Sequence, residues 1–243
     1  MTGKETIQLY PILLVNFIST LGFSIVLPFL IFLVRDFGGN AIVYGVLGAT
    51  YSAFQLIGAP LLGKWSDVYG RKKVLLLSNA GTLVGWIFFF IALLIPDQKL
   101  SLNTLIFGTF TMSLPILVIF LARAIDGITG GNVSVANAYL SDISSEKDRS
   151  GNFGKMAMSA NLGFILGPAI AGILGGTMFG SLLPIFAALL LSMFTLVVIG
   201  LRLKESKRLS TEIPISEEGS IRKVFAQECK PCFKVQKPTY SGQ

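Results

Sequence analysis

The chain contains six blocks of apolar residues that are each long enough to cross a lipid bilayer as a helix. A helix needs about 20 residues for this crossing. The predicted spans are Leu9–Val34, Ala41–Leu62, Val74–Ile95, Pro115–Leu140, Phe153–Gly175 and Leu182–Leu201. Only 14% of the 243 residues are charged, compared with about 25% in an ordinary soluble domain. The sequence therefore predicts an all-α integral membrane protein, with a six-helix transmembrane bundle over residues 1–201.

Two stretches lie outside these spans. Residues 101–114 mix apolar side chains with Thr and Gly, which predicts either an interfacial loop or an extended start of the fourth span. Residues 202–243 are rich in Ser, Glu, Lys and Pro, which predicts a polar tail that does not cross the membrane and whose last part follows no recognisable pattern. Its two cysteines, Cys229 and Cys232, have the spacing of a redox or metal pair. No second pair completes a zinc site, and no strand–helix context surrounds them.

The basic residues divide unequally between the two sides of such a bundle. With six spans both termini share a side, and that side holds Lys4, Lys64, Arg71, Lys72, Lys73, Lys147, Arg149, Lys155, Arg202, Lys204, Lys207 and Arg208. The opposite side holds only Arg35 and Lys99. Because Lys and Arg collect in cytoplasmic loops, we expect both termini in the cytoplasm. The same asymmetry accounts for the net charge of +7, so we predict no nucleic-acid partner.

The composition also excludes several kinds of chemistry. The chain has no histidine, which excludes histidine-based metal sites, catalytic triads and imidazole proton relays. No nucleotide-binding loop or serine-nucleophile motif is present, and the glycine-rich runs lie within spans rather than between a strand and a helix. We therefore predict a protein that is not an enzyme and that has no cofactor or metal.

A short charged segment separates the second and third spans: Gly63-Lys64-Trp65-Ser66-Asp67-Val68-Tyr69-Gly70-Arg71-Lys72-Lys73. Its charged side chains are expected at a membrane surface, because charge is costly in hydrocarbon. Gly63 and Gly70 are expected to permit turns of the backbone in a loop. Taken alone, a segment of this kind is also compatible with an ordinary surface loop.

The fourth span has an ionisable pair, Arg123 and Asp126, in otherwise apolar surroundings. Residues three apart share a helix face, so the two can approach each other. A charge at mid-bilayer costs at least about 2.5–3.5 kcal/mol and normally faces the bundle interior or a water-filled path. Two interpretations remain open: a pair that neutralises itself and holds the bundle together, or an Asp126 that exchanges Arg123 for a proton. Three polar residues of the first two spans are expected to line a substrate path: Asn16, Tyr51 and Gln55.

The fifth span contains a GxxxG pair, Gly163 and Gly167, which lets a neighbouring helix come close. Pro168 follows and removes a backbone donor, so we expect a kink there. The small residues continue to Gly172. GxxxG alone indicates only packing, whereas GxxxG followed by Pro and a cluster of small residues is much rarer.

These segments, in this order, resemble the major facilitator superfamily, and within it the proton-coupled drug antiporters of the tetracycline-efflux type. The resemblance covers residues 9–201. The segment Gly63–Lys73 resembles the loop between helices 2 and 3 of that family, although Val68 stands where a basic residue is usual. The sequence around Arg123 resembles the family's motif in the fourth span, although Asp126 stands where Gln or a small residue is common. The fifth-span pattern resembles the antiporter signature, although Ala171 stands where Gly is usual.

The resemblance implies a role for each motif. The whole transporter would export a small amphipathic compound in exchange for protons by alternating access, and Asp126 with Arg123 would be the proton-coupling site. A gate on the cytoplasmic side would consist of Gly63, Asp67, Gly70, Arg71, Lys72 and Asp142. Asp142 would pair with Arg71 in one conformation; the alternative is an ordinary acidic residue at a water boundary. A hinge would consist of Gly163, Gly167, Pro168 and Gly172.

The resemblance also implies partners. Transporters of this family have two six-span halves, and substrates bind between them near the midplane. We therefore expect lipid, a small-molecule substrate, protons and a missing C-terminal half, supplied by a separate chain or by a second copy. The chain would then be a truncated or split transporter, in a bacterial inner membrane. The alternatives to export are a proton symporter that takes up a metabolite, and a membrane subunit with no transport of its own.

Overall fold

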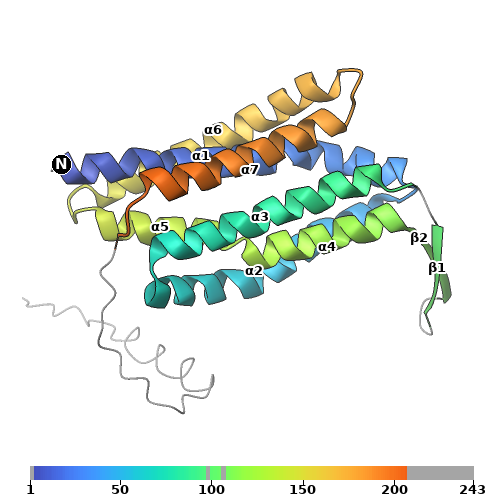
Figure 1. Ribbon diagram of the computed structural model, residues 1–243, viewed down its shortest axis with the longest axis horizontal. Helices are drawn as coiled ribbons and strands as arrows, with labels where there is room; N and C mark the ends of the chain where they lie inside the picture. Colours follow the sequence, from blue (N-terminus) through green and yellow to red (C-terminus); the bar gives the residue numbers. More distant parts are fainter. Residues whose placement is uncertain (1–2, 97–98, 105–107, 207–243) are drawn as a thin grey trace, which may run out of the picture. The chain divides into compact units, whose positions relative to one another are not determined.

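The computed structural model describes residues 3–96, 99–104 and 108–206 (Figure 1). The helices in this part of the chain are α1 (Gly3–Asp36), α2 (Ala41–Tyr69), α3 (Arg71–Leu94), α4 (Leu114–Thr129), α5 (Asn132–Ile143), α6 (Arg149–Gly175) and α7 (Leu182–Arg202). The strands are β1 (Lys99–Thr104) and β2 (Gly108–Ser113). The predicted tail, residues 202–243, lies outside the described residues after Ser206, and Cys229 and Cys232 lie there with it.

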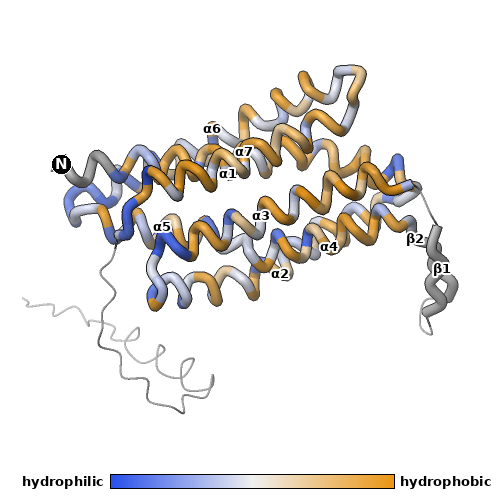
Figure 2. Tube along the Cα trace, in the orientation of Figure 1, coloured by the Kyte–Doolittle hydropathy of each residue, from blue (hydrophilic) through white to orange (hydrophobic). Residues whose placement is uncertain are grey.

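Six crossings of a membrane are confirmed by the length and apolar character of these helices. α4 and α5 together make the fourth crossing, from Leu114 to Ile143. Hydrophilic residues gather at the end of the bundle that holds the start of α1, the α2–α3 junction and the end of α7 (Figure 2). We call this the charged end. The opposite end of the bundle has the β1–β2 hairpin (Figure 1).

The charged segment between the second and third spans is not the loop that the sequence predicted. α2 continues through Tyr69 and α3 begins at Arg71, so only Gly70 lies outside a helix. Gly70 has a φ of 102°, a value that favours glycine, whereas Gly63 lies within α2. Both helices extend beyond the apolar blocks because their polar residues there find ion-pair and hydrogen-bond partners.

The fourth span is not a single helix. α4 ends at Thr129 and α5 begins at Asn132, with Gly130 and Gly131 between them. A β-carbon on Gly131 would lie 2.8 Å from a methyl of Leu62 on α2, so the break lies where another helix comes close. We attribute the break to this pair of glycines, since glycine weakens a helix interior.

The stretch before the fourth span forms a hairpin. β1 and β2 pair antiparallel, from Lys99 opposite Ser113 to Thr104 opposite Gly108. α4 begins directly after it, at Leu114. The prediction that residues 101–114 form an extended start of the fourth span is therefore wrong.

The helices pack in the order α2, α4, α3, α7, α1, α6, with α3 and α7 in the middle. This order has an internal symmetry. When the first three spans are exchanged with the last three, the α1–α6 contact maps onto the contact of the fourth span with α2. The α1–α7 contact likewise maps onto the contact of the fourth span with α3. Such symmetry is expected of two inverted repeats of three spans.

Glycines lie at both of the equivalent interfaces. Between α4 and α2, a β-carbon on Gly127 would lie 2.6 Å from the carbonyl oxygen of Tyr51. Between α6 and α1, a β-carbon on Gly163 would lie 2.9 Å from the backbone nitrogen of Leu21. Since real β-carbons do not come so close, these positions require glycine for the helix backbones to be in contact.

Candidate functional site in the bundle interior

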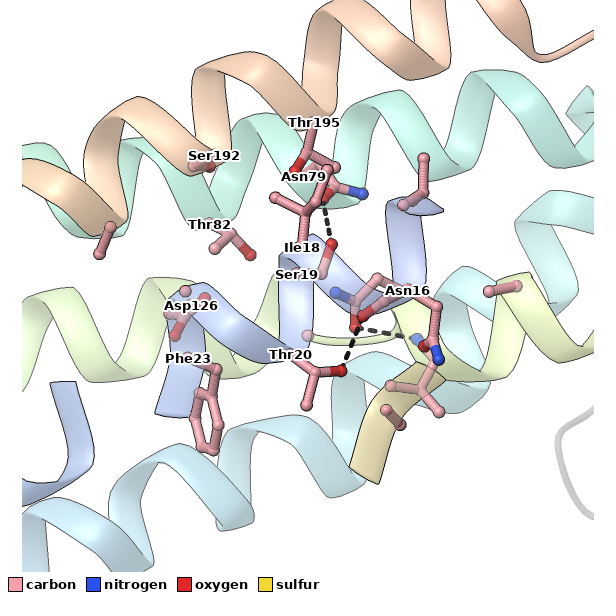
Figure 3. Close-up of a pocket in the computed structure, with 18 of the residues that line it drawn as sticks. Asn16, Ile18, Ser19, Thr20, Phe23, Asn79, Thr82, Asp126, Ser192 and Thr195 are labelled. Atoms are coloured by element: carbon pink, nitrogen blue, oxygen red, sulfur yellow. Dashed lines mark hydrogen bonds between the residues drawn. The ribbon is translucent and has the colours of Figure 1, made fainter. Parts of the chain in front are cut away.

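A cavity of about 400 Å³, lined by both apolar and polar side chains, lies between two hydrophobic clusters of the bundle. Along α1 one cluster ends at Val15 and the other begins at Leu21; along α3 the corresponding residues are Leu75 and Trp86. The polar residues in between line the cavity (Figure 3). Together with those of the other helices they are Asn16, Ser19, Thr20, Tyr51, Gln55, Asn79, Thr82, Asp126, Asn132, Ser192 and Thr195.

The predicted ionisable pair lies near the middle of the fourth span, and its Asp126 lines this cavity. Arg123 and Asp126 are almost inaccessible, with 3% and 5% of their surfaces exposed. Their closest approach is 3.7 Å, between Arg123 Nη1 and Asp126 Oδ2. A hydrogen-bonded pair of such groups is closer, at about 2.7–2.9 Å. Arg123 Nε has no hydrogen-bond partner among the described residues. The pair is therefore buried but only partly satisfied, which is uncommon for charged groups.

Three aromatic rings surround the guanidinium of Arg123. Its Cζ lies 5.7 Å from the ring centre of Tyr51, 5.4 Å from that of Trp86 and 4.5 Å from that of Phe89. These distances are within the range of about 6 Å in which a cation is attracted to a ring face. Asp126 instead lines the cavity, where Thr82 on α3 is a side chain that can donate a hydrogen bond to its carboxyl (Figure 3).

The three residues predicted to line a substrate path all line this cavity. Asn16 donates from Nδ2 to the carbonyl of Met156 at 3.0 Å. Gln55 donates from Nε2 to the Tyr51 hydroxyl at 3.1 Å and to the carbonyl of Gly130 at 2.9 Å. Asn16 thus joins α1 to α6, and Gln55 joins α2 to the break in the fourth span. A role in substrate movement stays a prediction.

Polar residues of α3 and α7 line the cavity as well, and the sequence analysis did not select them. The Ser19 hydroxyl donates to Asn79 Oδ1 at 3.2 Å, and Ser192 Oγ is buried without a partner in the described part of the chain. Asn79 and Thr82 are three residues apart, as are Ser192 and Thr195. Each of these pairs therefore shares a helix face. Polar residues three apart within an apolar span were therefore the feature of the sequence that could have indicated these lining residues.

At the charged end, Arg71 holds the α2–α3 junction to the fourth span. Its Nε lies 3.0 Å from Asp142 Oδ2, its Nη1 donates to Ser66 Oγ at 2.6 Å, and its Nη2 lies 2.7 Å from Asp67 Oδ1. The pair of Arg71 with Asp142 that the resemblance implied is therefore present in this structure. Its opening in another conformation stays a prediction.

The residues that follow α7 join the same network, and the sequence analysis did not select them either. The backbone nitrogen of Lys72, at the start of α3, donates to Glu205 Oε1 at 3.2 Å. A β-carbon on Gly70 would lie 2.7 Å from the other oxygen of that carboxylate. The Ser206 hydroxyl donates to Asp142 Oδ2 at 3.1 Å. Gly70 thus leaves room for a carboxylate from a distant part of the chain.

The predicted hinge residues of α6 differ in their surroundings. Gly163 and Gly167 lie against α1, where the Ser24 hydroxyl donates to the carbonyl of Gly163 at 2.8 Å. Pro168 lies inside α6, which continues to Gly175. A β-carbon on Gly172 would meet no described atom within 4 Å. The first two glycines form a close helix contact, and movement about the segment stays a prediction.

Residues 12–236 match the family described as Major Facilitator Superfamily. The chain belongs to this family. The tetracycline resistance protein of class E from Escherichia coli is 37% identical over 166 residues, which are 67% of this chain and 36% of that protein. Multidrug resistance protein 2 from Bacillus subtilis is 30% identical over 205 residues, which are 84% of this chain and 46% of that protein.

A solved structure supports the fold of this major facilitator chain. The human organic anion transporter MFSD10 (TETRAN) superposes with a TM-score of 0.71 at 23% identity, over 89% of this chain and 51% of that one. The chain spans about half of that transporter, and between a third and a half of the two bacterial relatives. It is a multi-pass membrane protein, and the relatives that it matches are resistance and transport proteins rather than enzymes.

Proposed function

We propose that this chain is the N-terminal half of a transporter that exports a small amphipathic compound in exchange for protons, by alternating access. Its partner would be a C-terminal six-span half or a second copy of the chain. The location would be a bacterial inner membrane, with the charged end in the cytoplasm. Tetracycline is the first substrate to test, because several relatives are tetracycline resistance proteins.

The observation that carries the proposal is the incomplete pairing of Asp126 with Arg123, where Asp126 lines the cavity. A carboxylate in a tight ion pair would hold its charge and bind no proton. Asp126 is 3.7 Å from its nearest partner nitrogen and lines a cavity large enough for water or a substrate group. Asp126 can therefore gain a proton, or a contact with a cationic substrate, without the loss of a complete set of hydrogen bonds.

The charged end supports the proposed gate and its side of the membrane. Arg71 joins α2 and α3 to Asp142 on α5 through a part-buried ion pair, and such a pair can form in one conformation and break in another. Basic residues outnumber acidic ones at this end, as they do on cytoplasmic surfaces. Gly163 and Gly167 would allow α6 to move while its backbone stays close to α1, because neither adds a side chain at the contact.

The test is tetracycline uptake into proteoliposomes with an imposed pH gradient. The 243-residue chain is reconstituted alone, and also together with the C-terminal half of the class E relative. An antiporter accumulates tetracycline in vesicles that are acidic inside, because protons leave as the compound enters. Asp126→Asn is expected to abolish this accumulation while the protein remains inserted. Protein-free vesicles measure passive partition of the compound.

Each result has a definite meaning. Accumulation only in vesicles that are acidic outside would show proton symport and overturn the proposed export. Equal accumulation by Asp126→Asn would remove Asp126 from proton coupling. No transport by any preparation, although the protein is folded and inserted, would favour a subunit that does not transport.

A further inference from the structure

We propose that Tyr51, Trp86 and Phe89 form an aromatic cage that holds the Arg123 cation while Asp126 takes up and releases a proton. The inference rests on the proposed function, since it deepens the role of the same proton site. Trp86 and Phe89 would be positioning residues, which act on the proton through Arg123. The relevant distances from Arg123 Cζ to the three ring centres are 4.5 to 5.7 Å.

A buried arginine needs compensation for the water that it has lost. The guanidinium has five donors, and in this structure its one carboxylate lies at 3.7 Å while its Nε has no described partner. Arg71 shows what a well-satisfied arginine in the same chain looks like, because its three nitrogens all have partners at 3.0 Å or less. The faces of three rings supply negative potential around Arg123, and their attraction grows when the cation is desolvated.

The rings differ from a carboxylate in one decisive respect. The faces of Trp86 and Phe89 keep their negative potential at every pH, whereas Asp126 loses its charge when it binds a proton. With the cage, Arg123 keeps favourable contacts in both states of Asp126. Without it, Arg123 would depend on an ionised Asp126 and would oppose its protonation.

The helix packing places the cage by means of two glycines. Gly85 directly precedes Trp86 on α3, and its β-carbon would lie 3.2 Å from that of Asp126, so α3 can approach α4 closely. Gly127 does the same for α2 and brings Tyr51 over Arg123. The ring centres of Trp86 and Phe89 lie 5.4 Å apart, so the two rings also support each other.

Few ionisable groups face Arg123 in the described part of the chain. They are Asp126 from its own helix and the Tyr51 phenol from α2. The α3 side chains over the guanidinium are the two uncharged rings. A change of the site with pH can therefore come from Asp126 or from the Tyr51 phenol. The variant Tyr51→Phe removes the phenol and keeps the ring, so in that variant the change reports on Asp126.

The test is stepwise fluorination of the ring at position 89, with one, two or three fluorine atoms on phenylalanine. Fluorine withdraws charge from the ring face and leaves its shape almost unchanged, so only an electrostatic role responds. The measurement is the infrared band of the protonated Asp126 carboxyl against pH in lipid, assigned by its loss in Asp126→Asn. We expect the midpoint to move to lower pH with each fluorine, by about one unit in total, a tenfold loss in proton affinity.

Phe90 provides a matched control. It lies on the same helix, and its ring contacts Phe186 rather than Arg123, with the centres 6.5 Å apart. The same fluorination there should leave the midpoint unchanged. In addition, Trp86→Leu should lower the midpoint, and Trp86→Phe should restore most of it.

Three outcomes would overturn the cage. They are a midpoint that does not move with fluorination at position 89, a midpoint that moves equally at position 90, and an Asp126 that does not titrate between about pH 4 and 10. The titration needs no transport, so it separates this inference from the proposed function. If the midpoint shifts as expected but tetracycline is not exchanged, the cage stands and the proposed export fails.

Discussion

Two arginines of this chain have opposite environments. Arg71, at the charged end, contacts Asp142, Ser66 and Asp67 within 3.0 Å, although Asp67 itself is 55% exposed on its side chain. Arg123, in the middle of the fourth span, has one carboxylate at 3.7 Å and three rings around it. Both arginines are buried, but each nitrogen of Arg71 has a close partner, whereas Arg123 in the middle of the span lacks such a set.

This difference is the reverse of what stability alone would favour. Unpaired charge is least costly at a water boundary and most costly in hydrocarbon. A protein that needed both arginines only for structure would pair the one in the middle of the span at least as completely. We interpret Arg71 as a connection between helices, and Arg123 as a group kept ready for a change in the charge of its partner.

The largest effect is expected from Arg123→Leu. It leaves Asp126 without a cation in a buried site, where a carboxyl stays neutral because its charged form is costly. Proton-driven exchange should fall by about 100-fold or more, in line with the loss of an acid–base group. Tetracycline accumulation in acid-inside vesicles measures this effect. An Arg123→Leu protein that keeps its exchange rate would show that the pair is only structural.

The double variant Arg123→Leu with Asp126→Asn separates folding from coupling. It removes both charges, so any instability of the single variant should be largely reversed, because breaking one side of a buried pair costs more than replacing both. Exchange should remain absent. Thermal unfolding in detergent, followed by tryptophan fluorescence, measures the first expectation.

The next effect concerns packing in the two regions. Gly167→Ala places a methyl group against Ser24 of α1 and should destabilise the bundle by about 1–3 kcal/mol. Gly63→Ala, near the charged end of α2, would meet no described atom within 4 Å and should stabilise the helix by about 0.5–1 kcal/mol. Unfolding in detergent compares the two.

Gly172→Ala is the control within α6, where a methyl group likewise has space. It should behave like Gly63→Ala. If Gly172→Ala is as harmful as Gly167→Ala, the cost does not come from the contact with α1. The predicted hinge would then be sensitive along its whole length.

A smaller effect is expected when Arg71 and Asp142 exchange charges. Arg71→Asp and Asp142→Arg should each lower exchange by about tenfold, since each leaves a part-buried charge beside a like charge. The double variant should recover only part of the loss, because Ser66 and Asp67 also contact Arg71. Exchange rates at matched expression measure this. No recovery at all would remove the Arg71–Asp142 pair from the gate.

Much of this fold could be predicted from sequence because the membrane restricts what the chain can do. Apolar blocks of about 20 residues must be helices in lipid, so the six crossings followed from block length alone. The helix ends did not follow. Residues 63–69 are polar enough for a loop, yet they continue α2. Ser66 and Asp67 contact Arg71, and Arg71 is held by Asp142, a partner that only the folded bundle brings close.

The candidate site was predictable only in part, for a similar reason. Arg123 and Asp126 are conspicuous because charge inside a span is rare. Trp86 and Phe89 are ordinary residues for a membrane helix, and nothing in the sequence marks them as neighbours of Arg123. Their relation to it depends on close α3–α4 packing, which Gly85 permits. Packing of this kind is a property of two helices together.

The smallest effect is expected from Glu205, which completes the start of α3. Gly70 precedes that helix and offers no capping side chain, and the first turn of α3 contains no acidic residue. The Glu205 carboxylate lies there and accepts from the backbone nitrogen of Lys72. Glu205→Gln should therefore cost only about 0.3 kcal/mol, the low end for a carboxylate at a helix start, since the group is exposed.

Hydrogen exchange of the first-turn amides of α3 is sensitive enough to detect this change. Protection should fall in Glu205→Gln at low salt and fall further in Glu205→Ala, which also removes the hydrogen bond. About 0.5 M salt should remove most of the difference between wild type and Glu205→Gln, because it screens an exposed charge. If the loss in Glu205→Ala persists in salt while that in Glu205→Gln disappears, the hydrogen bond contributes separately from the charge. In that case Glu205 and Arg71 would both stabilise the charged end through directed hydrogen bonds. Arg123, which has no such bond at its Nε, would then differ from both.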